Sequence, residues 1–492
     1  MNRFRVLSAA IVLLISIIFG IISYVAVLNK PVEKVNQTIE DISEYLTNSA
    51  KIKELSLPKK GSQAQSDPIV SYDFDGYVFR VLTSPSAKGK IGNSNILSDD
   101  LYTDVINATA YTRNAIVAEE LNIEIREFVA DEAGFDLKKS LLSFDDTYDL
   151  LSLKTNSEMY MQLQAGNLVD LRTIKTLNLD KPWYDSSSIR DLAIADKLFV
   201  LTGDIIAGNN DAVSAMVFNQ DLAKQFGYYT DDTYTFIEYV TSGRWTLDNL
   251  LAITENINSS IESGDATYGA FYTRGLDSFA LSVGAGAGSF YSDATGIPKI
   301  NLTSESFKKI FTKVYSIQTA PLGNSEIDAN GFMQGRTLFD TIELGDLRLL
   351  KETGINYCVL PLPKYDESQK EYRSSVNLTD AVSVAVPINQ QDLNRTGIII
   401  ERLSSESSRY MWESYYDSIT DSSADSQRMI KIILSNKVYD LGDLLGWINV
   451  SQALDDIIHS NDMSDFSDKL SDRSNAAQFV MNIILKNIEK NK

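Results

Sequence analysis

The chain has 492 residues and a formal charge of −21, from 45 basic and 66 acidic side chains. A chain of this length exceeds one small hydrophobic core, so two packed lobes are expected, and the acidic balance argues against a nucleic-acid partner. The single cysteine and single histidine exclude an intrachain disulfide and a Cys/His zinc cluster, and no cofactor is expected.

The first predicted element is an apolar segment close to the N-terminus. Residues 1–5 include Arg3 and Arg5, and the uncharged run 6–28 that follows is long enough to cross a bilayer as a helix. The two arginines favour a cytoplasmic start, which places the bulk of the chain outside, on the outer face of the cytoplasmic membrane. A cleaved signal peptide is the alternative, although the segment ends in SYVAVLNK rather than in a small-x-small cleavage site.

A stalk and linker are expected over residues 29–68. Apolar side chains recur there at spacings of three and four, which predicts one stripe of a helix: Val32, Val35, Ile39, Ile42 and Leu46. The following stretch PKKGSQAQSDP is polar and contains glycine and two prolines, so it is typical of a flexible tether.

The body of the chain then alternates strand-like and helix-like segments, which predicts an α/β fold. The segments in order are a strand at 77–84, a helix at 101–121, a strand at 122–129, a helix at 137–144 and a strand at 148–153. This order predicts parallel strands joined by right-handed crossovers, and ligands bind beyond the carboxyl ends of such strands. Ser84, Asn156 and Tyr160 therefore receive more weight than residues within the helices.

Several later passages carry a resemblance to a known family. They are GNLVDLRTIKTLNLDKPWYD (166–185), AMVFNQDLAKQFG (215–227), SGRWTLDNLLAI (242–253), the long run from Phe332 to Ser375 that contains YCVLPLP, ERLSSESSRYMWESYYDSI (401–419) and DSQRMIKIILSNKVYDLGDLLG (425–446). In this order they resemble the extracellular solute-binding proteins of ABC importers, in particular the carbohydrate-binding family 1.

The resemblance implies an α/β, two-lobed periplasmic-binding-protein-like fold of type II, after the N-terminal transmembrane helix and stalk. The solute-binding domain would cover residues 69–492. Its first lobe would comprise about 69–218 and 326–375, and its second lobe about 219–325 and 376–492.

A sugar site needs flat aromatic faces together with Asp, Glu, Asn and Arg side chains that bind hydroxyl groups. The candidate ligand-binding residues are Ser84, Tyr160, Trp183, Asn219, Tyr272, Arg274, Asp340, Glu343 and Asp380. Core packing is the competing interpretation for the rings, and a solvated face or a helix N-terminus is the competing role for Asp340 and Glu343. Trp245 is expected to pack at a helix start, and Cys358 is expected to be buried in an apolar strand.

The function that follows from the resemblance is binding without bond-making. The protein would capture a carbohydrate, specifically an oligosaccharide, between its lobes and deliver it to an ABC permease. A ligand-sensing or adhesive surface protein with the same fold is the alternative. A glycoside hydrolase needs two carboxylates about 5 Å or about 6.5–9.5 Å apart across a cleft, and the sequence singles out no such pair.

Overall fold

The computed structural model describes residues 72–88, 96–97, 105–230, 232–260, 268–272, 276–293, 296–319, 327, 329–420, 423–444 and 449–490. The predicted membrane anchor at 6–28 and the stalk at 29–68 lie outside the described residues. Within the described ranges, no helix is both long and apolar enough to span a membrane.

The first main sheet has the strand order β12–β3–β1–β2. Its strands are β1 (Tyr77–Thr83), β2 (Ile123–Val129), β3 (Leu150–Lys154) and β12 (Val382–Ala385). β1 runs parallel to β2 and β3, whereas β12 runs antiparallel to β3. The crossovers contain α3 (Val105–Leu121) and α4 (Ala133–Ser143), so the strand and helix order expected from the sequence is confirmed.

The second main sheet has the strand order β10–β4–β9. Its strands are β4 (Ser214–Asn219), β9 (Phe339–Glu343) and β10 (Tyr357–Leu360), and both outer strands run antiparallel to β4. All side chains of β4 and β10 are buried, because the sheet is covered on both faces. The prediction for Cys358 is confirmed, since this residue of β10 is 1% exposed.

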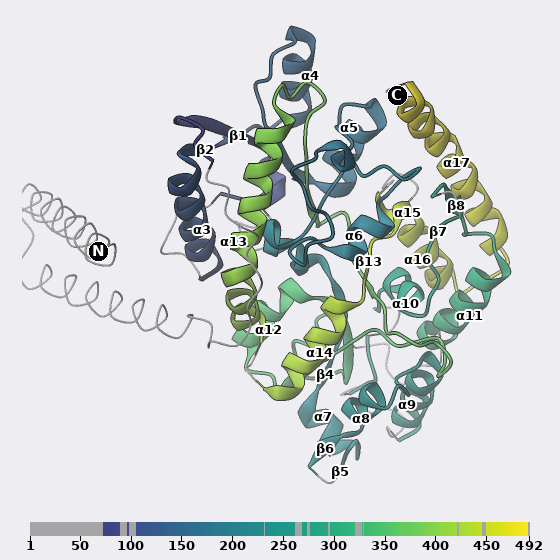
Figure 1. Ribbon diagram of the computed structural model, residues 1–492. Coiled ribbons are helices and arrows are strands. Elements are labelled where there is room, and N and C mark those ends of the chain that lie inside the picture. The colour runs from purple at the N-terminus through teal and green to yellow at the C-terminus, as the bar shows by residue number, and fades with distance from the viewer. Residues whose placement is uncertain are drawn as a thin grey trace, which may run out of the picture. The chain divides into compact units, whose positions relative to one another are not determined.

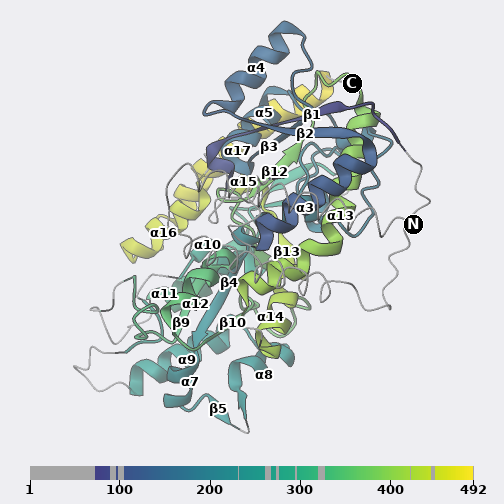
Figure 2. The ribbon, with the colours of Figure 1, turned by 90° about the vertical axis from the view of Figure 1, so that its left-hand side faces the viewer.

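The pairing of these strands divides the chain differently from the boundaries expected from the sequence. We call the part around the first sheet the first lobe and the part around the second sheet the second lobe (Figure 2). The sequence placed 326–375 in the first lobe and 376–492 in the second. In the structure β9 and β10 pair with β4, while β12 pairs with β3. A hydrophobic pattern identifies a buried strand but not its neighbour, because strand pairing is decided by long-range packing.

The remaining elements surround the two sheets (Figure 1). The helices are α5 (Tyr160–Ala165), α6 (Ser186–Asp191), α7 (Gln220–Gln225), α8 (Thr235–Thr241), α9 (Leu247–Ser260), α10 (Ser278–Gly284), α11 (Glu305–Thr319), α12 (Leu347–Thr353), α13 (Leu393–Ile419), α14 (Ala424–Ser435), α15 (Leu441–Leu444), α16 (Val450–Ser460) and α17 (Phe466–Lys490). The short strands are β5 (Tyr229–Thr230), β6 (Thr233–Tyr234), β7 (Phe290–Ser292), β8 (Pro298–Ile300), β11 (Ser374–Ser375) and β13 (Lys437–Val438).

Two long helices contact both lobes. In α13, Leu403 belongs to the apolar cluster of the first sheet, and Tyr415 lies beneath the guanidinium of Arg348 from α12, 5.6 Å from ring centroid to carbon. In α17, the ring of Phe466 stacks on α11, and Asn487 Nδ2 donates to a backbone carbonyl of α5 at 2.7 Å. Both helices therefore tie the lobes together beside the segments that cross between them.

Three crossing segments lie side by side between the two sheets. Val213 forms a bridge with Val376, and β11 pairs in parallel with β13. The amide of Val376 also donates to the carbonyl of Val438 at 3.0 Å. We call the segments 211–214, 374–378 and 436–440 the crossing ribbon.

Candidate functional site

A cavity of about 210 Å³ lies where the parallel strands of the first sheet end. It is lined by Ser86, Lys154, Gly208, Asp211, Ala212, Glu343 and Asp380. Lys154 is the last residue of β3, and Ser86 follows β1. The carboxyl ends of parallel strands are where α/β sheets bind ligands, so we call this cavity the cleft.

The carboxylate of Glu158 organises the first-lobe wall of the cleft. Ser84 Oγ donates to Glu158 Oε2 at 2.6 Å, and Ser86 Oγ donates to Oε1 at 3.0 Å. The backbone amide of Lys154 donates to the same carboxylate at 3.1 Å. The ends of β1 and β3 are thereby fixed together, with Ser84 buried behind Ser86.

Asp380 and Glu343 meet in the cleft from different elements. Lys154 Nζ lies 3.2 Å from Asp380 Oδ1 and donates to the backbone carbonyl of Asp380 at 3.0 Å. Asn377 Nδ2 donates to Glu343 Oε1 at 2.6 Å and to Asp380 Oδ2 at 3.2 Å. Two of the residues singled out from the sequence are therefore joined through one amide of the crossing ribbon.

A second charged pair supports the opposite wall. Arg348 Nη1 lies 2.9 Å from Asp211 Oδ1, and the Asp211 side chain is buried. A Cβ atom at Gly345 would come within 2.9 Å of the Cβ of Asp211, so the turn after β9 approaches the ribbon as closely as a glycine permits. This pair holds the end of β9 against the ribbon.

Carboxylates predominate around the cleft. Desolvation raises the pKa of Asp277 to about 6, and the charges of Asp455 and Glu343 raise it further. Desolvation also raises the pKa of Asp443 to about 7, and nearby carboxylates add to this shift. With Asp211, Glu343 and Asp380 in the lining, the cleft and its surroundings offer many hydrogen-bond acceptors.

Four of the nine predicted residues lie away from this cluster. Tyr160 is 4% exposed and belongs to the hydrophobic core. Trp183 packs edge-on against Tyr184, 6.3 Å between ring centroids, and is partly buried against the apolar cluster of the first sheet. Asn219 is buried and caps α7 through two backbone amides. Asp340 lies three positions from Glu343 on β9, so the two side chains point to opposite faces of the sheet.

The loop that contains the two remaining candidates is described in part. Tyr272 is 36% exposed and precedes the gap at 273–275, and Arg274 lies outside the described residues. The amide of Asp277, just after this gap, donates to Thr341 Oγ1 at 2.9 Å. The loop therefore returns to β9 two residues before Glu343.

Several residues of the cleft were not found from the sequence. They are Ser86, Lys154, Glu158, Asp211, Arg348 and Asn377. The sequence could have identified Lys154 as a cleft residue, because it is a charged residue directly at the end of a buried strand. The others are brought together by tertiary structure, and their sequence surroundings carry no such mark. In the described ranges, no group of three or more His, Cys, Asp or Glu side chains could hold a metal ion.

No protein-family model matches the chain, and no curated protein matches it. Among solved structures, the apo form of RafE from Streptococcus pneumoniae is 13% identical with a TM-score of 0.53, and the match covers 84% of this chain and 99% of that one. An ABC substrate-binding protein from Listeria monocytogenes in complex with cycloalternan is 12% identical with a TM-score of 0.51, covering 83% and 100%. A cyclo/maltodextrin-binding protein complexed with maltotetraose is 13% identical with a TM-score of 0.51, covering 85% and 99%.

These matches extend over nearly the whole of each solved chain. The resemblance inferred from the sequence passages is confirmed at the level of the fold. The described chain therefore shares the mixed α/β, two-lobed fold of these three solved structures.

Proposed function

We propose that this chain is an extracellular solute-binding protein of type II that captures an oligosaccharide in the cleft and delivers it to an ABC permease. The observation that carries the proposal is the convergence of Lys154, Glu343 and Asp380 at the carboxyl ends of the first sheet. The shared fold supports the same assignment. Residues 6–28 would either anchor the protein at the outer face of the cytoplasmic membrane or act as the cleaved signal that exports it.

The chemistry of the cleft suits hydroxyl groups. Carboxylates accept hydrogen bonds from sugar hydroxyls, while Lys154 and Asn377 supply donors. The side chains already hold one another in place, so little reorganisation is needed when a ligand arrives. Binding would stabilise the closed arrangement of the lobes and leave the sugar intact.

Calorimetric titration with raffinose, maltotetraose and mannotriose tests the proposal. At least one sugar should bind the wild-type protein and raise its melting temperature. Asp380→Asn should weaken that binding tenfold or more, because it removes the carboxylate that positions Lys154. Asp248→Asn is the matched control, since it removes a Lys–Asp pair of 2.8 Å on the exposed surface.

Two results would contradict the proposal. Equal affinities in the wild type and in Asp380→Asn would remove the cleft from the binding site. Shortened sugar products, measured by chromatography after incubation, would indicate a hydrolase instead.

A further inference from the structure

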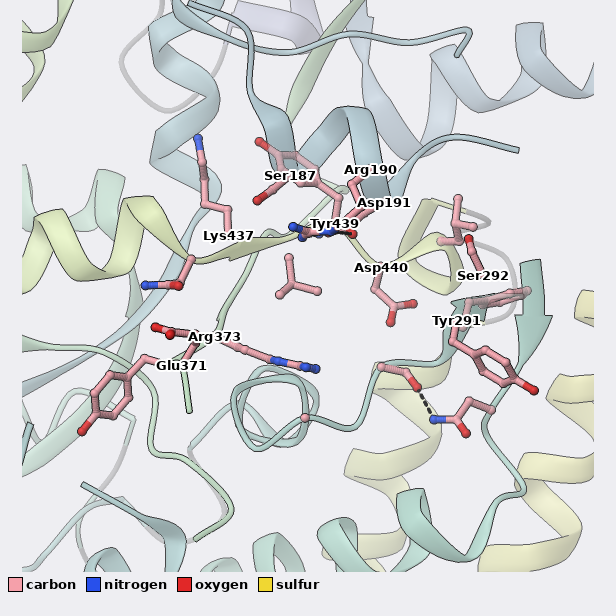
Figure 3. A pocket seen from close by; sticks show the side chains of 18 of the residues that line it. Ser187, Arg190, Asp191, Tyr291, Ser292, Glu371, Arg373, Lys437, Tyr439 and Asp440 are labelled. Atoms are coloured by element: carbon pink, nitrogen blue, oxygen red, sulfur yellow. Dashed lines mark hydrogen bonds and ion pairs between the residues drawn. The ribbon is translucent and has the colours of Figure 1, made fainter. Parts of the chain in front are cut away.

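A second and larger cavity lies at the other edge of the crossing ribbon. Glu343 pairs opposite Ser214 at one edge, and Val376 joins Val438 at the other. The cavity of about 620 Å³ is bounded by the segment 435–441 and shares no lining residue with the cleft. We call it the edge cavity (Figure 3).

Both lobes contribute to the walls of the edge cavity. The first lobe supplies Ser187, Arg190 and Asp191 from α6, and the second lobe supplies β7 with the glycine-rich turn that follows α10. Figure 3 shows Arg190 and Asp191 on one side, Tyr291 and Ser292 on a second side, and Arg373 reaching in from a third.

The glycine-rich turn is held in a defined position. Asp440 Oδ2 accepts from the amide of Ser289 at 2.6 Å, and Oδ1 accepts from the amide of Gly442 at 2.7 Å. A Cβ atom at Gly288 would lie 3.2 Å from the Asp440 carboxylate, so the turn packs closely on it. The wall that carries β7 is therefore built into the fold.

The ionic side chains of the edge cavity are balanced in number. Three cations and three carboxylates line it: Arg190, Arg373 and Lys437, with Asp191, Glu371 and Asp440. Arg190 is engaged by Asp191, with Nε to Oδ1 at 2.6 Å, and Lys437 is engaged by Asp185. Within the described ranges, the guanidinium of Arg373 has no hydrogen-bond or ion-pair partner and is exposed.

An exposed aromatic surface lies beside these polar groups. Tyr291 is 56% exposed, and Phe290 before it is half-buried. A tyrosine face packs against the C–H surface of a sugar ring, while an unengaged guanidinium offers a fork of donors to neighbouring hydroxyls. Once Asp185, the partner of Lys437, is counted with these carboxylates, the ionic groups do not favour an anionic ligand. The volume falls within the range of about 300–1,000 Å³ typical of small-molecule sites.

We propose that the edge cavity is a second ligand site, which takes a neutral short oligosaccharide with Tyr291 and Arg373 as its principal contacts. This site does not depend on the proposed function of the cleft, because it uses none of the same residues. Since its walls come from both lobes, a sugar held there bridges them outside the cleft.

Titration calorimetry on the full chain, in a detergent without a sugar head group, tests this site with raffinose, maltotetraose and mannotriose. Tyr291→Ala and Arg373→Gln should each weaken the binding of at least one of these sugars tenfold or more. Tyr111→Ala and Arg428→Gln are matched controls, because they change an exposed tyrosine and an exposed arginine elsewhere. Unliganded melting temperatures should stay within about 2 °C of the wild type, since both tested side chains are exposed.

The two sites are separated by comparison with Asp380→Asn. Binding that is weakened by Tyr291→Ala and Arg373→Gln but retained in Asp380→Asn supports the edge site, even if the proposed role of the cleft fails. Sugar binding that none of the edge variants changes, or absence of binding by all three sugars, overturns the edge site. Binding lost only in Asp380→Asn leaves the cleft as the binding site and rejects the edge cavity.

Discussion

Asp340, one of the candidate ligand residues, is a carboxylate of β9 whose pKa is raised in the folded protein. It lies on the face of β9 opposite to Glu343. Its carboxylate accepts a hydrogen bond from the amide of Thr341 at 2.8 Å. Desolvation raises its pKa to about 7, and the nearby charge of Asp346 adds to the shift. In the unfolded chain the pKa of the same carboxyl group is about 3.9.

This difference predicts a pH-dependent stability. Between about pH 4 and pH 7 the folded chain keeps the proton that the unfolded chain has lost. The stability contributed by protonated Asp340 is therefore fully present below about pH 4 and is lost as the pH rises through about 7. We expect Asp340→Asn to have a flatter profile of melting temperature between pH 4.5 and 8, and to exceed the wild type above pH 7. Parallel profiles for the two proteins would contradict this assignment, and Asp248→Asn is the surface control.

Three of the candidate residues lie at or directly behind the cleft wall. Ser84 and Asp380 were singled out beside predicted strands, whereas Glu343 was chosen as a carboxylate that could bind hydroxyl groups. Tyr160 also follows a strand, but it begins a helix whose inward face packs on the core. The direction of a side chain on a short helix depends on tertiary packing, which spacing along the chain does not reveal.

At the scale of elements, Asn219 marks the junction between a strand and a helix. Its Oδ1 atom accepts from the amides of Asp221 and Leu222 at 2.9 and 3.0 Å, at the start of α7. These are amides that a helix leaves without intrahelical partners. The contacts explain why an asparagine ends a strand whose other residues are apolar or small.

We expect Asn219→Ala to lower the free energy of unfolding by about 1 kcal/mol, since an uncapped helix start leaves those amides unsatisfied. Asn219→Asp should retain most of the stability, because aspartate caps equally well. Urea denaturation measures the effect, and sugar affinity should stay unchanged in both variants. A loss of sugar affinity at unchanged stability would instead make Asn219 a ligand contact.

The helices and strands could be predicted from the sequence more fully than the pairing of the strands with one another. The strand YCVL and the buried Trp245 before α9 agree with the sequence, since short apolar runs and helix starts are local features. The passage 401–419 lies within α13, which begins earlier, at Leu393, where Asp392 accepts from the amide of Arg395 at 3.0 Å. An aspartate before a helix is a local feature of the sequence that indicates a helix start. The placement of β9 and β10 beside β4 depends instead on contacts between distant segments.

At the scale of the whole molecule, the crossing ribbon is fixed to the first lobe by a buried ion pair. Lys437 Nζ lies 2.5 Å from Asp185 Oδ2 and donates to Asn210 Oδ1 at 2.9 Å. Tyr439 Oη also donates to Asp185 at 2.7 Å. Both charged side chains are less than 10% exposed, so each depends on the other for compensation.

Lys437→Met should destabilise the folded chain by about 3–5 kcal/mol, because Asp185 would remain buried without a cation. The double variant Lys437→Met with Asp185→Asn should recover part of the loss, since no uncompensated charge remains. Chemical denaturation of the four members of this cycle measures the coupling. Equal stability of the single and double variants would show that the charge of Asp185 is compensated in another way.

Cys358 gives the chain a practical property for measuring motion. It is the only cysteine and lies buried in β10, so thiol reagents meet no accessible sulfur in the folded protein. Phe135 on α4 and Leu349 on α12 are each 57% exposed and belong to different lobes. Cysteines introduced at these two positions would carry a donor and an acceptor dye without background labelling. Energy transfer between the dyes would then follow the separation of the lobes as sugar is added.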